Sequence, residues 1–317
     1  MSEFGIFWGT EIYNYEDSKS PIIEHLLYED DVLCISSEAG VGKSILALQL
    51  IFSLTSQEPF LDTYAVKKKC RVLYVQTEGD RSETLERIGN MKKALSIDDG
   101  MWTHINLAGL MLNLDDKMNE FITLAKISNM EYDVIIIDPL YTTVKGSMIK
   151  DEIATDWVRN IRKLKGIFDA SLIVLHHDNK AIYHEGRIID RGNKNIFGSV
   201  FWGAFFNQNY KLKSWNNIHT LEIGKSRSGK MTDKLEMKLL EPSPLMFTLC
   251  DDELDLSTAR VIAVLKKSEK PMSPMEVQKA IDMSRATAFR ALAKLVATER
   301  AIKTFEGNNT FYELKKL

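Results

Sequence analysis

The sequence predicts an α/β fold, in which helices cover both faces of a mostly parallel β-sheet, followed by a small separate domain. Between residues 31 and 225, short β-branched and apolar runs alternate with longer helix-forming segments, which is the pattern of βαβ units. The strand-forming runs are nearly continuous in apolar residues, as expected for strands covered on both faces. An acidic stretch at residues 251–255 has no periodicity of its own, so we place the domain boundary there and predict domains 1–250 and 257–317.

The elements of the larger domain follow in order along the chain. Strands are expected at residues 32–36, 72–75, 134–137 and 172–175. Helices are expected at residues 43–54, 82–91, 117–127 and 152–167. After Gly198 the pattern changes to hairpin-like strands, expected at residues 209–214, 220–225 and 234–240.

Composition excludes several classes of protein. The chain has 317 residues, of which 44% are hydrophobic and 27% charged, values typical of a globular protein rather than a fibre or a disordered chain. The first residues do not resemble a secretory signal, and no run approaches the roughly 18 apolar residues of a membrane span. Cys34, Cys70 and Cys250 form no metal-binding or disulfide pattern. We therefore expect a cytoplasmic protein with reduced thiols and no membrane partner.

A phosphate-binding loop is predicted between the first strand and the first helix. Its residues are Ser37, Glu38, Ala39, Gly40, Val41, Gly42, Lys43 and Ser44. The two glycines allow the backbone N–H groups to surround a β-phosphate, and the start of the helix adds positive potential. Lys43 is expected to bind the β- and γ-phosphates and Ser44 to bind Mg²⁺. The predicted cofactors are therefore ATP and Mg²⁺, although Ser37 replaces the first glycine of the usual motif.

Three other strand ends carry candidate catalytic side chains. Asp138 ends an apolar strand and is expected to hold Mg²⁺ through water. Glu78 follows a neighbouring strand and is the candidate general base that orients the attacking water. His176 and His177 end a further strand. One of the two imidazoles is expected to sense the γ-phosphate, and the sequence does not distinguish which of them does so.

Together these motifs resemble the RepA-like branch of the RecA-type hexameric ATPases, the plasmid and phage replicative helicases. The resemblance covers about residues 20–230 and is carried by segments 21–27, 73–78, 137–140, 176–180 and 197–199. It implies a RecA-like P-loop fold and a homo-oligomeric ring, which is a hexamer in this family. The resemblance also implies that the protein moves along DNA. It also implies that Asp138 and Glu78 are the metal and base residues, and that the histidine pair couples nucleotide state to DNA contact.

The resemblance further implies two basic regions. The family donates a basic pair on a late strand into the neighbouring subunit's site, and here Lys225 and Arg227 match it, with Arg227 as the finger. Such an arginine is worth about 10³ to 10⁵ in rate in GTPases. The loop at residues 181–196 follows Lys180 and contains Arg187 and Arg191; it would face the ring channel and contact single-stranded DNA. An ordinary hairpin turn and an ordinary surface loop remain the alternatives.

The C-terminal segment looks like a winged helix-turn-helix. A helix is expected at residues 257–267, a second begins with the capping box of Ser273 and Glu276, and a third begins near residue 284. Strands at 301–306 and 310–314 would form the hairpin wing. The third helix would offer Arg285, Thr287 and Arg290 to a major groove, and the wing would offer Lys303 to the backbone.

Charge favours duplex DNA as the partner of this segment. Residues 257–317 contain 12 Lys and Arg against 6 Asp and Glu, a net charge of +6, whereas the rest of the chain carries −9. Such a basic footprint suits phosphate, although winged helices also dock proteins. The sequence thus predicts an ATP-hydrolysing DNA motor of a mobile element. The alternatives are an ATP-switched DNA-binding initiator or regulator without strong unwinding activity, and a recombinase-like filament former.

Overall fold

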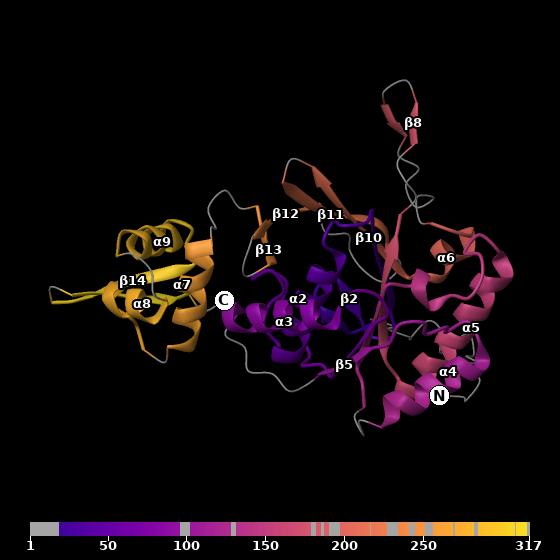
Figure 1. Ribbon diagram of the computed structural model, residues 1–317. Coiled ribbons are helices and arrows are strands. Elements are labelled where there is room, and N and C mark those ends of the chain that lie inside the picture. The colour runs from indigo at the N-terminus through magenta and orange to yellow at the C-terminus, as the bar shows by residue number, and fades with distance from the viewer. Residues whose placement is uncertain are drawn as a thin grey trace, which may run out of the picture.

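A nine-stranded sheet forms the centre of the protein (Figure 1). The computed structural model describes residues 19–95, 102–127, 131–178, 182–184, 187–189, 197–215, 217–226, 234–240, 245–250, 256–268, 270–281, 285–307 and 309–315. The strand order is β13-β12-β11-β10-β3-β7-β6-β4-β5. Strands β3, β4, β5, β6, β7 and β10 are parallel to their neighbours within this group, whereas β10 to β13 pair antiparallel. The mostly parallel α/β fold predicted from the sequence is therefore confirmed.

The strand bounds place four carboxyl ends side by side. The parallel strands are β3 (Val32–Ser37), β4 (Val72–Gln76), β5 (Trp102–Asn106), β6 (Val134–Asp138), β7 (Ser171–His177) and β10 (Gln208–Trp215). The antiparallel strands are β11 (Ile218–Ser226), β12 (Leu235–Leu240) and β13 (Met246–Leu249). Because the central strands are parallel, the residues that follow β3, β4, β6 and β7 meet at one edge, where ligands of open α/β sheets bind.

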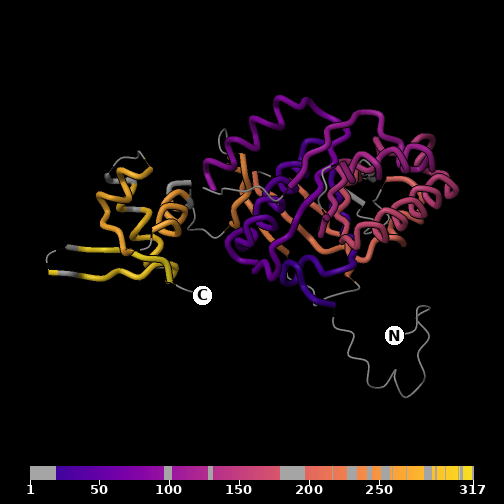
Figure 2. The backbone as a smooth tube through the Cα atoms, turned by 90° about the horizontal axis from the view of Figure 1, so that it is seen from below, coloured from indigo at the N-terminus to yellow at the C-terminus, as the bar shows by residue number. Residues whose placement is uncertain are grey.

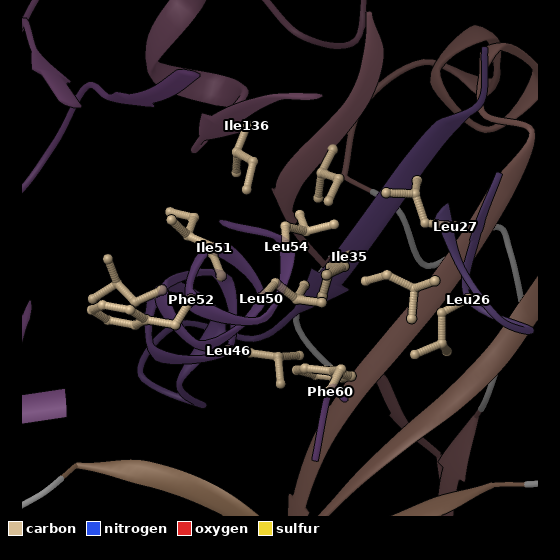
Figure 3. Packing of buried hydrophobic residues seen from close by; sticks show 14 of the residues in the cluster. Leu26, Leu27, Ile35, Leu46, Leu50, Ile51, Phe52, Leu54, Phe60 and Ile136 are labelled. Carbon is tan, nitrogen blue, oxygen red and sulfur yellow. The ribbon is translucent and has the colours of Figure 1, made fainter. Parts of the chain in front are cut away.

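Helices cover both faces of the sheet. On one face lie α2 (Lys43–Ser56) and α3 (Arg81–Leu95), and on the other lie α4 (Asp115–Lys126), α5 (Asp151–Phe168) and α6 (Val200–Phe205). The core around α2 contains Leu46, Leu50 and Phe52, and Leu50 lies next to Ile35 of β3 (Figure 3). Because both faces are covered, the strands carry apolar side chains on each side, which explains their continuous apolar runs.

Several elements differ from the sequence predictions. Strands β5 and β13 were not predicted, and each lies at one edge of the sheet. The stretch at 181–196, predicted as a loop, contains β8 (Ile182–His184) paired with β9 (Arg187–Ile189). Two further short strands, β1 (Pro21–Ile23) and β2 (Leu27–Tyr28), precede β3. A 3₁₀ turn, η1 (Tyr141–Thr143), follows β6.

The C-terminal residues form three helices and a hairpin with a hydrophobic cluster of their own. The elements are α7 (Leu256–Lys267), α8 (Pro274–Ile281), α9 (Arg285–Ala297), β14 (Ala301–Glu306) and β15 (Asn309–Leu314). They lie beside the sheet in both views, in orange and yellow (Figures 1 and 2). The capping box is confirmed, because Ser273 N donates to Glu276 Oε2 at 2.7 Å.

Two contacts connect later parts of the chain to α2 and to the segment after it. The Gln49 amide forms a pair of hydrogen bonds with Phe247, its Nε2 donating to the Phe247 carbonyl at 2.8 Å and its Oε1 accepting from the Phe247 N–H at 2.9 Å. In α7, Lys266 Nζ lies 3.1 Å from Glu58 Oε2 and 3.2 Å from Asp62 Oδ1. Both acids lie in the segment that follows α2, so β13 contacts the middle of this helix and α7 contacts the segment after its C-terminal end. No helix within the described ranges is long and apolar enough to cross a membrane.

Candidate functional site

The turn between β3 and α2 has the backbone that a phosphate-binding loop requires. Gly40 and Gly42 have φ angles of +77° and +99°, a region that glycine enters without steric cost. Gly42 caps α2, and a Cβ atom there would lie 2.8 Å from the Cζ atom of Phe247. Glycine is therefore required at position 42 both by its φ angle and by the ring beside it.

Lys43, the first residue of α2, is folded back over this turn. Its Nζ atom donates to Ser37 Oγ at 2.8 Å and to the carbonyl groups of Ser37 and Glu38 at 3.3 and 3.1 Å. Burial lowers the pKa of Lys43, and the negative charges of Asp138, Asp178 and Glu78 oppose that shift. Ser37 is buried at the end of β3, so the residue that departs from the usual motif orients the lysine.

Asp138 ends β6 directly beside the P-loop helix. It is buried, and Tyr74 Oη donates to its Oδ2 at 2.7 Å. Burial raises the pKa of Asp138, whereas hydrogen bonds from Tyr74 and Ser44 oppose the rise. A carboxylate and a hydroxyl that meet in this way fit a Mg²⁺ ion, which prefers oxygen ligands. Tyr74 occupies one carboxylate oxygen and so fixes the direction of the other.

The two adjacent histidines lie on opposite faces of β7. His177 Nδ1 lies 3.4 Å from Lys43 Nζ, and the His177 ring packs edge-on against Tyr141 with centroids 4.8 Å apart. His176 is fully buried against Trp202 of α6, and its Nδ1 accepts the His177 backbone N–H at 2.8 Å. Burial lowers the pKa of His176 to about 3. The geometry thus brings His177, and not His176, to the P-loop lysine.

Glu78 lies two residues beyond the end of β4. Its Oε2 atom accepts a hydrogen bond from Tyr141 Oη in η1. Its negative charge acts on Lys43, His177 and Asp138, which places the carboxylate among these three groups. The arrangement contains the groups needed to bind a triphosphate, hold a metal ion and remove a proton from water.

Comparison with known proteins agrees with this geometry. A protein-family model described as an AAA domain matches residues 14–181, just over half of the chain. The chain belongs to this AAA domain family. The match spans the P-loop, Glu78, Asp138 and both histidines, and it supports nucleotide binding and hydrolysis by a P-loop ATPase. No curated protein matches the chain.

The basic residues predicted to contact DNA or a neighbouring subunit lie on several different elements. Lys225 lies in β11, and its Nζ donates to the Gly203 carbonyl at the end of α6 at 2.8 Å. Lys303 is exposed in β14, with its Nζ 5.0 Å from the centroid of the Phe305 ring. The predicted residues Lys180, Arg191 and Arg227 lie outside the described residues. Arg187 lies in β9, and Arg285, Thr287 and Arg290 lie in α9, but their side chains are outside the described part of the structure.

Two tyrosines of the AAA domain site were not predicted from the sequence. Tyr74 stands on the same face of β4 as Gln76, and Gln76 pairs with Asp138, so strand alternation could have identified it. Tyr141 follows β6 by three residues, and no local pattern distinguishes it from other loop aromatics.

Proposed function

We propose that the protein is a cytoplasmic, ATP-hydrolysing DNA motor of the RepA-like type, with a RecA-like core that works as a hexameric ring. The observation that carries this proposal is the meeting of Lys43, His177, Glu78 and Asp138 at one edge of a parallel sheet. These four side chains come from four different strand ends or loops. Their order along the chain is that of the replicative helicases the sequence resembles.

Each group has a part in hydrolysis. The loop from Ser37 to Ser44 cradles the phosphates, and Lys43 binds the β- and γ-phosphates. Ser44 and Asp138 hold Mg²⁺, which neutralises phosphate charge when bound. Glu78 takes the proton of the attacking water. His177 contacts the γ-phosphate and responds to its loss, because it already lies within reach of the lysine that binds it.

Catalysis is shared between subunits in this proposal. Arg227 is the finger that reaches a neighbour's γ-phosphate, and Lys225 supports it. The Lys225 contact with the end of α6 favours this role, because α6 follows the segment 181–196 that we propose lines the channel. Movement of the finger strand and of the DNA-contacting segment would thereby be linked. Lys180, Arg187 and Arg191 are proposed to contact single-stranded DNA.

The second domain, residues 257–317, is proposed to be a winged helix that binds duplex DNA. Three helices, a hairpin and a separate hydrophobic cluster support this assignment, as does the net charge of +6. Arg285, Thr287 and Arg290 at the start of α9 would contact base edges. Lys303 on the hairpin would contact the phosphate backbone.

One observation favours the alternative of an ATP-switched initiator or regulator. The Lys266 contacts with Glu58 and Asp62 connect the basic domain to the segment that follows the helix beginning at the P-loop. A nucleotide-dependent shift of α2 would then move the DNA-binding domain directly, and strand unwinding would not be required.

The proposal is tested by measuring the ATPase rate with and without single-stranded DNA, paired with a native mass measurement. A motor predicts stimulation by single-stranded DNA, a hexameric mass with nucleotide, and unwinding of a forked duplex. An ATPase that ignores single-stranded DNA and does not unwind the fork, yet binds duplex DNA only with ATP, would support the switch instead. Electron microscopy of the assembled particles separates a ring from a filament.

A further inference from the structure

We propose that Tyr141 is a positioning residue that holds the carboxylate of Glu78 in its working orientation. The inference rests on the proposed function, since it assumes that Glu78 is the general base. It starts from a single contact: Tyr141 Oη donates a hydrogen bond to Glu78 Oε2. This hydroxyl is the one partner that the described residues supply to the Glu78 side chain as a hydrogen-bond donor.

The two residues are held together by the backbone around them. Thr77, next to Glu78, donates its N–H to the Asp138 carbonyl at 2.9 Å, and its Oγ1 donates to the Pro139 carbonyl at 3.3 Å. The Thr77 hydroxyl also meets that of Thr142, which is next to Tyr141. The turn after β4 is therefore fastened to the turn after β6, and the Glu78–Tyr141 contact does not depend on two free side chains meeting by chance.

The contact leaves the chemistry of the base intact. Tyr141 occupies Oε2, so Oε1 stays available to water. In hydrolysis the water oxygen bonds to the γ-phosphorus, the bond from that phosphorus to the bridging oxygen of ADP breaks with its electron pair on ADP, and the carboxylate takes the water proton. An exposed glutamate loses rotamer freedom when it is ordered. A fixed hydrogen bond offsets that cost before the reaction begins.

The ring of Tyr141 adds a second connection. It packs edge-on against His177, with centroids 4.8 Å apart and planes at 66°, and His177 in turn lies 3.4 Å from Lys43 Nζ. One tyrosine thus touches both the base and the residue proposed to detect the γ-phosphate. A change in the position of His177 would be transmitted to the orientation of Glu78 through this ring.

The test is the variant Tyr141→Phe, which keeps the ring on His177 and removes the hydroxyl. We expect kcat to fall about 10-fold, the effect of losing one hydrogen bond to a charged group, while KM for ATP stays within about twofold. The acid limb of the kcat pH profile should move to higher pH, because a carboxylate that loses a donor becomes more basic. A purely structural role would not move that limb.

A double-mutant cycle and a matched tyrosine complete the design. Tyr141→Phe should have no further effect when added to Glu78→Gln, since the hydroxyl acts only through the carboxylate. Tyr132→Phe removes a hydroxyl that contacts the Ala125 carbonyl on the far side of the sheet, and it should leave kcat and the acid limb unchanged. Thermal unfolding of each variant checks that the fold is retained.

The outcomes separate the inference from the proposed function. If Glu78→Gln hydrolyses ATP at the wild-type rate, the base assignment and with it the catalytic part of the proposed function fail. If Glu78→Gln is inactive but Tyr141→Phe matches the wild type in kcat and pH profile, only the positioning role is wrong. A faster Tyr141→Phe enzyme would mean that the hydroxyl restrains Glu78, which also overturns the inference.

Discussion

The Nδ1 atom of His177 lies 3.4 Å from the Nζ atom of Lys43, so the end of β7 and the P-loop are in direct contact. An ammonium group can only donate, so Nδ1 is the acceptor and the imidazole is neutral. Burial lowers the pKa of His177, and the positive charge of Lys43 lowers it further. A neutral imidazole with its proton on Nε2 can still donate a hydrogen bond to a phosphate oxygen.

Removal of this imidazole should slow hydrolysis more than it weakens binding. We expect His177→Ala to lower kcat about 10-fold, the effect of one hydrogen bond to a charged group, with a smaller change in ATP affinity. Steady-state ATPase assays and fluorescent-nucleotide titration measure the two quantities. His25→Asn replaces an exposed histidine away from the site and is the control. Equal rates for His177→Ala and the wild type would exclude the proposed sensing role.

His176 should control the acid stability of the protein. Its pKa is lowered from 6.5 to about 3 by burial, so below pH 6.5 the unfolded chain binds a proton that the folded chain does not. Its stabilising effect is therefore complete above pH 6.5 and is lost as the pH falls toward 3. Between pH 7 and 5 the free energy of unfolding should fall by about 2 kcal/mol from this group. Urea unfolding of wild type and His176→Asn at both pH values measures the difference, and equal pH dependence would refute the assignment.

Nucleotide binding and hydrolysis should separate in two variants. Lys43→Ala should abolish ATP binding, because it removes the cation that meets the phosphates. Glu78→Gln should bind ATP normally and lose about 10² to 10⁴ in rate, the usual contribution of a general base. Nucleotide titration and phosphate release measure the two steps. Tight ATP binding by Lys43→Ala would contradict the P-loop assignment.

Deletion of residues 257–317 should weaken duplex DNA binding and leave the basal ATPase rate intact. The segment carries a net charge of +6, and phosphate contacts release counterions, so binding by the intact chain should also fall steeply with salt. Fluorescence anisotropy with a labelled duplex at two salt concentrations checks both statements. Unchanged affinity after the deletion would assign the segment to protein docking.

Shared catalysis predicts rescue between two inactive variants. Arg227→Ala should bind ATP almost normally and hydrolyse it poorly, because a guanidinium clamps phosphate oxygens in a way that other side chains do not. A mixture of Arg227→Ala with Lys43→Ala subunits should regain activity, since some mixed interfaces combine an intact P-loop with an intact finger. Wild-type specific activity should also rise with protein concentration during assembly. Freely exchanging mixtures with no recovery would exclude the shared site.

The fold was predictable where the pattern of residues is local. Continuous apolar runs identified β3, β6 and β7, and the glycine turn identified the start of α2. Strand β5 was missed because its sequence, Trp102–Asn106, mixes polar and apolar side chains at a half-buried edge of the sheet. Strand β13 has four residues, and its position depends on Gln49, which is almost two hundred residues away in sequence.

The residues of the candidate site that stand at strand ends could be predicted from the sequence, whereas the side chains that contact them could not. Asp138 and Glu78 follow apolar strands, which the sequence shows. The choice between His176 and His177 depends on which face of β7 packs toward α2. Because both faces of β7 carry apolar side chains, the sequence does not show which face this is. Tyr141 meets Glu78 only because two separate turns are hydrogen-bonded to each other. Such contacts arise from tertiary structure, which a local pattern does not report.

The two hydrogen bonds between Gln49 and Phe247 hold β13 against α2, and they therefore limit how far the C-terminal domain can move from the sheet. Strand β13 ends at Leu249 and α7 begins at Leu256, so seven peptide units connect β13 to the C-terminal domain and span about 25 Å at most. Even with the Lys266 contacts broken, the domain would stay within that distance of β13. The proposed duplex contact of this domain would therefore stay within reach of the phosphate-binding loop of the same subunit, because Phe247 of β13 lies against Gly42.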